Sequence, residues 1–243
     1  MKTVRELKAM ADELLFGGSY TEALHAYCAL LDLQPLHLDA RLRVADALLA
    51  LGEIQRAALV YNSLARYSAN AGYPLHAIMA LKILSQLDPQ FNALLKSVAE
   101  LYAAGSPRLG RGARMAPPDP EQEIRPDLEL QLREVPPRDQ LFRRAESVGS
   151  SFEDSGVQYP ELLTPLPLLS LLPAKDFDAV LKAIKLLRVR PGTAVITEGE
   201  VGNSFFVLGR GSVRVTRKEK SGKQIQLAVL HPGSIFGEMA LLN

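Results

Sequence analysis

The sequence has no tryptophan and only one cysteine, Cys28, so an internal disulfide framework is excluded. Four scattered histidines and this cysteine show no spacing that is typical of a zinc site. The formal net charge is only +1, so the total charge gives no support to binding of nucleic acid or of an acidic membrane surface. The longest apolar stretch, residues 162–172, is too short to span a bilayer and contains two prolines.

The sequence does contain enough apolar residues for real cores. Hydrophobic residues make up 47% of 243 positions, which predicts one or two domains. Residues 1–6 are charged and lead into an amphipathic pattern, unlike the apolar segment of a secretion signal. We therefore expect a soluble, cytoplasmic protein that does not bind membranes.

Composition divides the chain into three regions. Residues 1–105 are rich in Ala and Leu with helical periodicity, which predicts an all-α domain. Residues 106–162 contain clusters of proline, glycine and charge, which predict a linker. Residues 163–243 begin with an amphipathic helix and continue with β-branched alternation and regular glycines, which predict a β domain. The predicted fold class is therefore a multidomain combination of α and β structure.

The N-terminal region repeats with a period of 34 residues. The recurring residues are Gly18, Ala23 and Tyr27, followed by Gly52, Ala57 and Tyr61. This is the tetratricopeptide period, in which small residues let helices approach closely and glycines allow tight turns. Six helices are predicted, over residues 3–16, 20–33, 38–51, 53–70, 74–87 and 91–104. The alternative is an ordinary helical bundle that repeats twice.

Residues 1–105 resemble a tetratricopeptide-repeat array. The resemblance rests on Gly18-Ser19-Tyr20, Glu22-Ala23, Tyr27 and Pro35. The aromatic residue usual at the fourth motif position is absent, and Leu7 and Arg41 stand there instead. The resemblance implies a helical-repeat solenoid whose concave surface binds a protein partner.

Seven prolines between residues 106 and 137 block long helices in the linker region. This composition favours a solvated, partly extended tether, with a short helix predicted over residues 138–148. The alternative is a docking or self-association motif at the basic end of the linker, residues 108–114.

The C-terminal region combines one helix with short strands. The helix is predicted over residues 175–187, and strands over 194–197, 205–208, 212–217 and 224–230. Glycine-containing turns separate these strands, a pattern typical of an all-β barrel or jelly roll.

Residues 163–243 resemble a cyclic nucleotide-binding domain, which implies a β jelly-roll fold. The motifs, in the family's order, are Pro191-Gly192, Glu198-Gly199-Glu200 with Gly202-Asn203-Ser204-Phe205-Phe206, Gly209-Arg210-Gly211-Ser212-Val213, and Pro232-Gly233 with Phe236-Gly237-Glu238-Met239-Ala240-Leu241-Leu242. The implied regulatory ligand is cAMP or cGMP, and no other cofactor and no metal is expected.

The last motif offers chemistry that suits such a ligand. Gly237 has no side chain, so its backbone can approach a ribose phosphate, and free N–H groups near Ala240 can hold an anion. The ionised carboxylate of Glu238 accepts hydrogen bonds, which suits a ribose hydroxyl. By resemblance, Glu238 is the ribose ligand and the amides near Ala240 and Leu241 hold the phosphate. The predicted ligand-binding residues are Phe236, Gly237, Glu238, Met239, Ala240 and Leu241.

The family places an arginine for the phosphate a few residues after this motif, followed by further strands and helices. None of these stands before the last residue, Asn243, so we expect a domain that is incomplete at its C-terminus, in a fragment of a longer protein. Nucleotide binding is then expected only in a longer protein that contains the missing strands and helices of the domain. The alternative is a degenerate module that binds no ligand.

The sequence shows no nucleophile elbow, no zinc-protease motif and no phosphate-binding loop, so we predict that the chain is not an enzyme. The favoured hypothesis is a regulatory adaptor in which a cyclic nucleotide modulates a protein interaction of the helical repeats. A second hypothesis is a ligand-independent scaffold. A weaker third is part of a transcriptional regulator, but no DNA-binding helix-turn-helix follows, and no nucleic-acid partner is expected.

Overall fold

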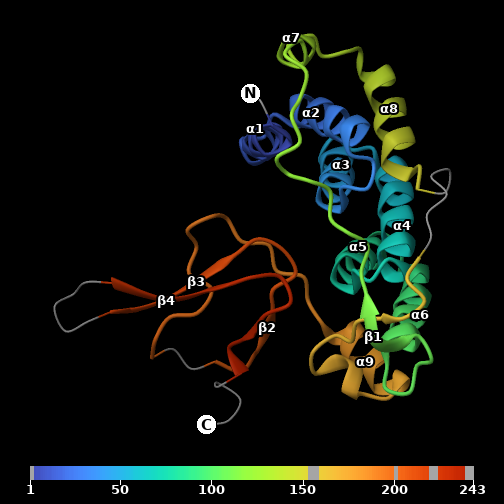
Figure 1. Ribbon diagram of the computed structural model, residues 1–243, viewed down its shortest axis with the longest axis vertical. Helices are drawn as coiled ribbons and strands as arrows, with labels where there is room; N and C mark the ends of the chain where they lie inside the picture. The colour runs from blue at the N-terminus through green and yellow to red at the C-terminus, as the bar shows by residue number, and fades with distance from the viewer. Residues whose placement is uncertain (1–2, 153–158, 200–201, 219–223, 239–243) are drawn as a thin grey trace. The chain divides into compact units, whose positions relative to one another are not determined.

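The computed structural model describes residues 3–152, 159–199, 202–218 and 224–238 (Figure 1). Contacts divide the chain into two compact units, Met1–Ile184 and Lys185–Asn243, which are described separately. In the described part of the chain, no helix has both the length and the apolar character needed to cross a membrane.

The first unit begins with six helices that pack in succession, each against the next (Figure 1). They are α1 (Val4–Phe16), α2 (Tyr20–Leu33), α3 (Leu38–Ala50), α4 (Ile54–Asn70), α5 (Pro74–Leu87) and α6 (Asn92–Tyr102), with a 3-10 turn, η1 (Pro89–Phe91), before α6. All six predicted helices are thus confirmed, with ends that differ by at most two residues. Gly18 and Gly52 have φ of 86° and 85°, which permits the predicted tight turns between helices.

The 34-residue period is also visible in the side-chain contacts. Tyr27 donates a hydrogen bond to Asp12 with an O–O distance of 2.6 Å, and 34 residues later Tyr61 makes the same bond to Asp46, also at 2.6 Å. Arg43 lies between the two pairs, 3.0 Å from the Asp46 carboxylate and 3.7 Å from that of Asp12. The repeats are therefore joined by polar contacts as well as by apolar packing.

The described residues of the linker, 106–152 and 159–162, pack against the first unit in several places, so the expectation of a solvated tether is wrong for them. Strand β1 (Leu109–Ala113) forms bridges to Leu163, the Met115 amide donates to the carbonyl of Ala71 after α4, and the carbonyls of Pro120 and Gln122 accept from amides of α1. Two helices follow, α7 (Leu128–Gln131) and α8 (Arg138–Ser150), and α8 packs on α2, α3 and α4. The prolines do prevent long helices, but extended segments find backbone partners on the repeats and α8 buries an apolar face.

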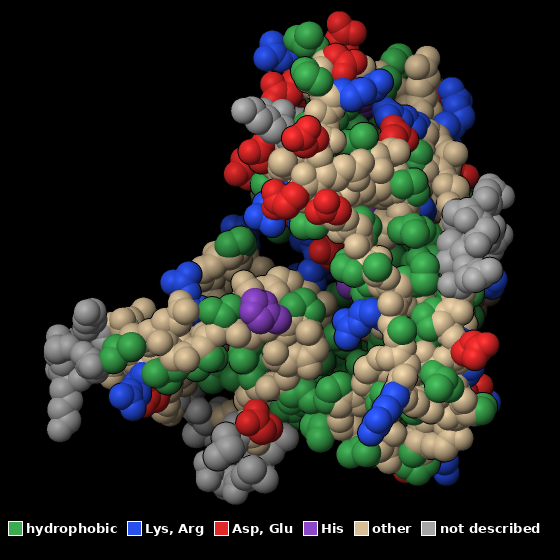
Figure 2. All heavy atoms as spheres, viewed as in Figure 1, with side chains coloured by type: hydrophobic (Ala, Val, Ile, Leu, Met, Phe, Trp, Pro, Cys, Tyr) green, Lys and Arg blue, Asp and Glu red, His purple; other side chains and the backbone are tan. Residues whose placement is uncertain are grey.

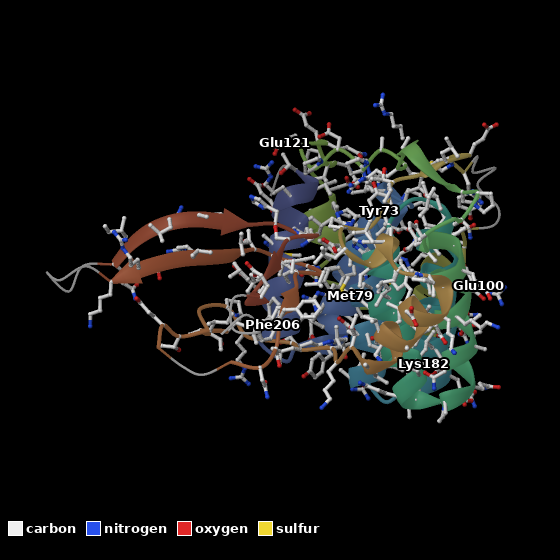
Figure 3. All side chains as sticks on the ribbon, turned by 90° about the horizontal axis from the view of Figure 1, so that it is seen from below. Tyr73, Met79, Glu100, Glu121, Lys182 and Phe206 are labelled. Atoms are coloured by element: carbon white, nitrogen blue, oxygen red, sulfur yellow. The ribbon has the colours of Figure 1, made fainter. Side chains whose placement is uncertain are left out.

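The helix that was expected to lead the β domain packs in the first unit. After the turn η3 (Leu169–Leu171), helix α9 (Ala174–Ala183) lies against α6, with Phe177 and Leu181 fully buried. Figure 3 shows Glu100 of α6 and Lys182 of α9 on these neighbouring helices. Lys82 of α5 donates to the carbonyl oxygens of Leu181 and Lys182, at 3.1 and 3.0 Å. Packing thus groups residues 163–184 with the repeats, unlike the predicted boundary at residue 163.

The second unit consists of short strands, β2 (Phe206–Val207), β3 (Val213–Lys218), β4 (Gln224–Leu230) and β5 (Ile235–Phe236). β3 and β4 form an antiparallel hairpin, and β2 pairs antiparallel with β5. The described residues therefore form two two-stranded sheets and not a closed barrel. The strand predicted over residues 194–197 is not formed, because no described strand pairs with this segment.

Candidate functional site

The predicted ligand-binding motif begins where β5 pairs with β2. Phe236 is directly opposite Phe206 in this ladder, and their rings stack with centroids 5.3 Å apart and an interplanar angle of 19°. Figure 3 shows Phe206 on its strand. The aromatic pair fixes the register of β5, and with it the starting point of the motif.

A turn before β5 strengthens the same pairing. Gly233, with a φ of 95°, donates its amide to the carbonyl of Leu208 at 2.8 Å, and the Leu208 amide donates to the carbonyl of Ser234 at 2.9 Å. The Ser234 hydroxyl accepts a hydrogen bond from the amide of His231 at 3.2 Å. The Pro232-Gly233 turn predicted from the sequence is thus a hydrogen-bonded support for the motif.

Gly237 has a packing role that sequence reasoning missed. Its φ is 82°, and a Cβ atom added there would lie 2.9 Å from the Cδ1 atom of Ile196 and 3.2 Å from the ring of Phe206. Both the conformation and the close approach require glycine. The sequence suggested that Gly237 admits a ligand, whereas the structure shows the side chain of Ile196 close to this glycine.

The rest of the predicted site is described only in part. Glu238 is exposed, so its carboxylate is accessible to a ligand. Met239, Ala240 and Leu241, which were expected to supply the amides that hold an anion, lie outside the described residues. The structure therefore brings Phe236 and Gly237 together with Phe206 and Ile196.

The second unit exposes both charged and apolar side chains. Arg214 and Arg217 are exposed on β3, as expected from the alternation of polar and apolar residues. In the described residues, no group of histidine, cysteine and acidic side chains is placed to hold a metal ion. Hydrophobic side chains are visible on the surface of this unit (Figure 2), and Leu227, Val229 and Phe205 are all more than 40% exposed.

The first unit contains a buried polar cluster that the sequence did not reveal. The Arg41 side chain is only 1% exposed, and burial lowers the pKa of its guanidinium to about 10. Its Nε atom donates to the carbonyl of Pro35 at 2.8 Å and Nη1 donates to the carbonyl of Gly149 at 2.7 Å. One feature of the sequence could have indicated this buried arginine: Arg41 stands at a motif position that usually carries an aromatic residue.

A cavity of about 190 Å³ lies between α2, α7 and α8. His25 lies on its wall, and the Nε2 atom of this histidine is 3.3 Å from the carbonyl oxygen of Gln131. Burial lowers the pKa of His25, and the positive charge of Arg144 acts in the same direction. Arg144 itself pairs with Asp32 across the cavity wall.

The two units together define a helical-repeat protein joined to a β module with an aromatic, glycine-containing motif. Comparison with known proteins identifies both parts. Residues 8–74 match the model of the tetratricopeptide repeat, and residues 186–243 match that of the cyclic nucleotide-binding domain. The chain therefore contains tetratricopeptide repeats and a cyclic nucleotide-binding domain, as the sequence predicted.

Similar curated proteins include regulatory subunits of cAMP-dependent protein kinase and cGMP-dependent protein kinases. The chain is 42% identical over 85 residues to the cAMP-dependent protein kinase regulatory subunit of Yarrowia lipolytica, a match that covers 35% of this chain and 22% of that protein. It is 34% identical over 87 residues to human cGMP-dependent protein kinase 2, with 35% and 11% covered. The match thus spans about a fifth or less of each relative. No solved structure matches the chain significantly.

Proposed function

We propose that this protein is a non-enzymatic regulatory adaptor, in which a cyclic nucleotide bound by the second unit modulates a protein interaction of the helical repeats. The observation that carries the proposal is the combination of the two matched domains in one chain, since both are regulatory and not catalytic. For regulation, the nucleotide must bind more tightly to one arrangement of the protein than to another. The ligand class is cAMP or cGMP.

In this proposal the nucleotide contacts the motif that follows β5. The exposed carboxylate of Glu238 accepts a hydrogen bond from the ribose, while the backbone at Gly237 and at residues 239–241 faces the phosphate. The stacked pair Phe206 and Phe236 holds the start of this motif against β2. A cytoplasmic location is part of the same proposal, supported by a lone cysteine, Cys28, that is buried and unpaired.

Isothermal titration calorimetry of the complete gene product with cAMP and with cGMP tests the proposal. We expect saturable binding of one or both nucleotides. Replacing Glu238 with Ala removes one charge-assisted hydrogen bond, so the affinity should fall about tenfold or more. Glu198→Ala is the matched control, because this carboxylate is also exposed in the second unit but does not belong to the predicted ligand-binding residues 236–241.

The titration also separates the proposal from its main alternative. Unchanged affinity in Glu238→Ala would refute the ribose role of this carboxylate while leaving nucleotide regulation in place. No heat of binding with either nucleotide, in a protein that is folded by circular dichroism, would refute the regulatory adaptor. A ligand-independent scaffold would then be the better description.

A further inference from the structure

Helix α8 lies along a face of the repeats that we call the docking groove, formed by α2, α3 and α4 (Figure 1). Its buried residues, Leu141, Phe142, Ala145 and Gly149, share one helical face, while the other positions are partly or fully exposed. A Cβ atom at Gly149 would lie 2.7 Å from Cγ2 of Val60, so α8 approaches the groove as closely as its backbone allows. This geometry is that of a helix bound in a groove.

The groove recognises the C-terminal end of α8 through side chains of the repeats. The last carbonyl groups of a helix have no partner within the helix and carry its partial negative charge. Arg41 of α3 donates to the carbonyl of Gly149 at 2.7 Å, and Ser63 of α4 donates to that of Ser150 at 2.8 Å. Among the described residues, no carboxylate forms an ion pair with Arg41, so the end of α8 is a main source of compensation for this buried charge.

An aromatic residue just after α8 completes this contact. The Phe152 ring lies under the Arg41 guanidinium, 3.7 Å from its carbon atom to the ring centroid. The same ring stacks on Tyr67 with a centroid distance of 3.9 Å and an interplanar angle of 7°. Arg41 stands where the repeat usually has an aromatic residue, and Phe152 brings an aromatic ring to that place from outside the repeat.

Two ion pairs set the direction of the bound helix. Arg144 pairs with Asp32 of α2, and Glu146 lies 3.1 Å from the Nε atom of Arg56 of α4. These pairs are half-exposed, so they contribute little to affinity and mainly fix orientation. The N-terminal half of α8 contributes Leu141 and Phe142 to the buried face, and Arg144 at its middle borders the cavity described above.

We propose that the docking groove is a binding site for an amphipathic helix of a partner protein, and that α8 with Phe152 occupies it as an internal ligand that such a helix displaces. The partner helix presents apolar residues at the positions of Leu141, Phe142 and Ala145, glycine at that of Gly149, and an aromatic residue three positions later. This inference rests on the partner-binding half of the proposed function and specifies the chemistry of that partner.

A peptide exchange experiment tests the inference with the full chain. A fluorescein-labelled peptide of residues 137–152 is titrated with the wild-type chain and with a chain that carries Gly149→Leu and Phe152→Ala, and anisotropy is measured. The two substitutions weaken the internal helix by a steric clash and by loss of the ring, while the groove is unchanged. The internal helix competes at high effective concentration, so we expect the peptide to bind the doubly substituted chain about tenfold or more tightly than the wild type.

Matched controls decide whether the peptide occupies the groove. A peptide with Gly149→Leu should lose binding, and so should the doubly substituted chain that also carries Arg41→Lys, because lysine cannot reproduce the planar guanidinium. Absence of peptide binding to a doubly substituted chain that is folded by circular dichroism would overturn the inference. Equal binding of both peptides would do the same. Cyclic nucleotide is absent from this titration, so its outcome does not depend on the nucleotide half of the proposed function.

Hydrogen exchange of the wild-type chain provides a second test that needs no substitution. An exchangeable α8 opens without unfolding of the repeats, so its amides should exchange about tenfold or more faster than those of α4. Equal protection of the two helices would show that α8 is a permanent part of the core, and would overturn the inference even where the substituted chain fails to fold.

Discussion

The helical unit and the β unit of this protein bury their side chains to very different degrees. In Met1–Ile184, large side chains such as Tyr27, Leu48 and Leu64 are fully shielded from solvent. In the described residues of Lys185–Asn243, no side chain is buried, and Leu227 remains 57% exposed. Each helical repeat gains its core from its immediate neighbours, whereas a β module must pair and cover strands that are distant in sequence. Stability should therefore reside mainly in the repeats.

The largest effect that tests this difference is expected in the helical core. Leu48→Ala removes a side chain with 0% exposure and should lower the free energy of unfolding by about 3 kcal/mol. Ile225→Ala, in the half-buried face of β4, should cost about 1 kcal/mol or less. Urea denaturation followed by circular dichroism at the helical band, with a second probe for the β unit, measures both. Similar losses for the two variants would contradict the comparison.

A smaller effect is expected at the repeated tyrosine–aspartate bonds. Tyr61→Phe deprives the buried Asp46 of one partner and should cost about 1–2 kcal/mol, since this is a hydrogen bond to a charged group. Tyr27→Phe is the matched variant, in which the partner Asp12 is more accessible to water, so the loss should be smaller. Thermal unfolding of the wild type and the two variants measures both losses of stability. A larger loss for Tyr27→Phe than for Tyr61→Phe would contradict this account.

In the β unit, Gly237→Ala should destabilise by about 1–2 kcal/mol, because the added methyl group meets Ile196 and the φ of 82° is unfavourable for alanine. Gly211→Ala is the control, since it has a φ of 83° and no atom near its Cβ position. The difference between them isolates the packing contribution, measured by chemical denaturation of the β unit. If the two variants are equally stable, Ile196 does not pack on Gly237 in solution.

The smallest expected effect concerns pH and the helical unit. The pKa of His25 is lowered in the folded protein, first by burial, from its ordinary value of 6.5. Below about pH 6.5 the unfolded chain therefore binds a proton that the folded protein resists, and the free energy of unfolding falls as pH decreases. His25→Gln should reduce this dependence between pH 7.5 and 5.5, as measured by melting temperatures. An identical pH dependence in wild type and variant would exclude His25 as its source.

The helices of the repeats could be predicted from sequence because their signals are local. Apolar residues recur with helical spacing, and Gly18, Gly52 and Pro74 mark helix ends that the structure confirms. The path of residues 106–162 could not be predicted in this way, because clustered prolines indicate only that long helices are absent. The spacing of Leu141, Ala145 and Gly149 was the one available signal for the packing of α8, and its significance depends on distant residues such as Val60.

The candidate site was predictable only as a motif. The order of glycine turns identified the module and the position of residues 236–241, but the packing of Ile196 against Gly237 joins residues that are 41 positions apart. The strand expected over residues 194–197 failed for the same reason. Local sequence indicates that a segment could form a strand, but it does not show whether a partner strand lies beside it.

The two hydrogen bonds from Lys82 anchor the end of α9, the last helix before the second unit. The lysine holds the carbonyl groups of Leu181 and Lys182, and the second unit begins only three residues after Lys182. The chain therefore leaves the first unit from a helix end that is fixed by hydrogen bonds. The last helix of the first unit is thus held to α5 by hydrogen bonds and to α6 by packing, next to the point where the second unit begins.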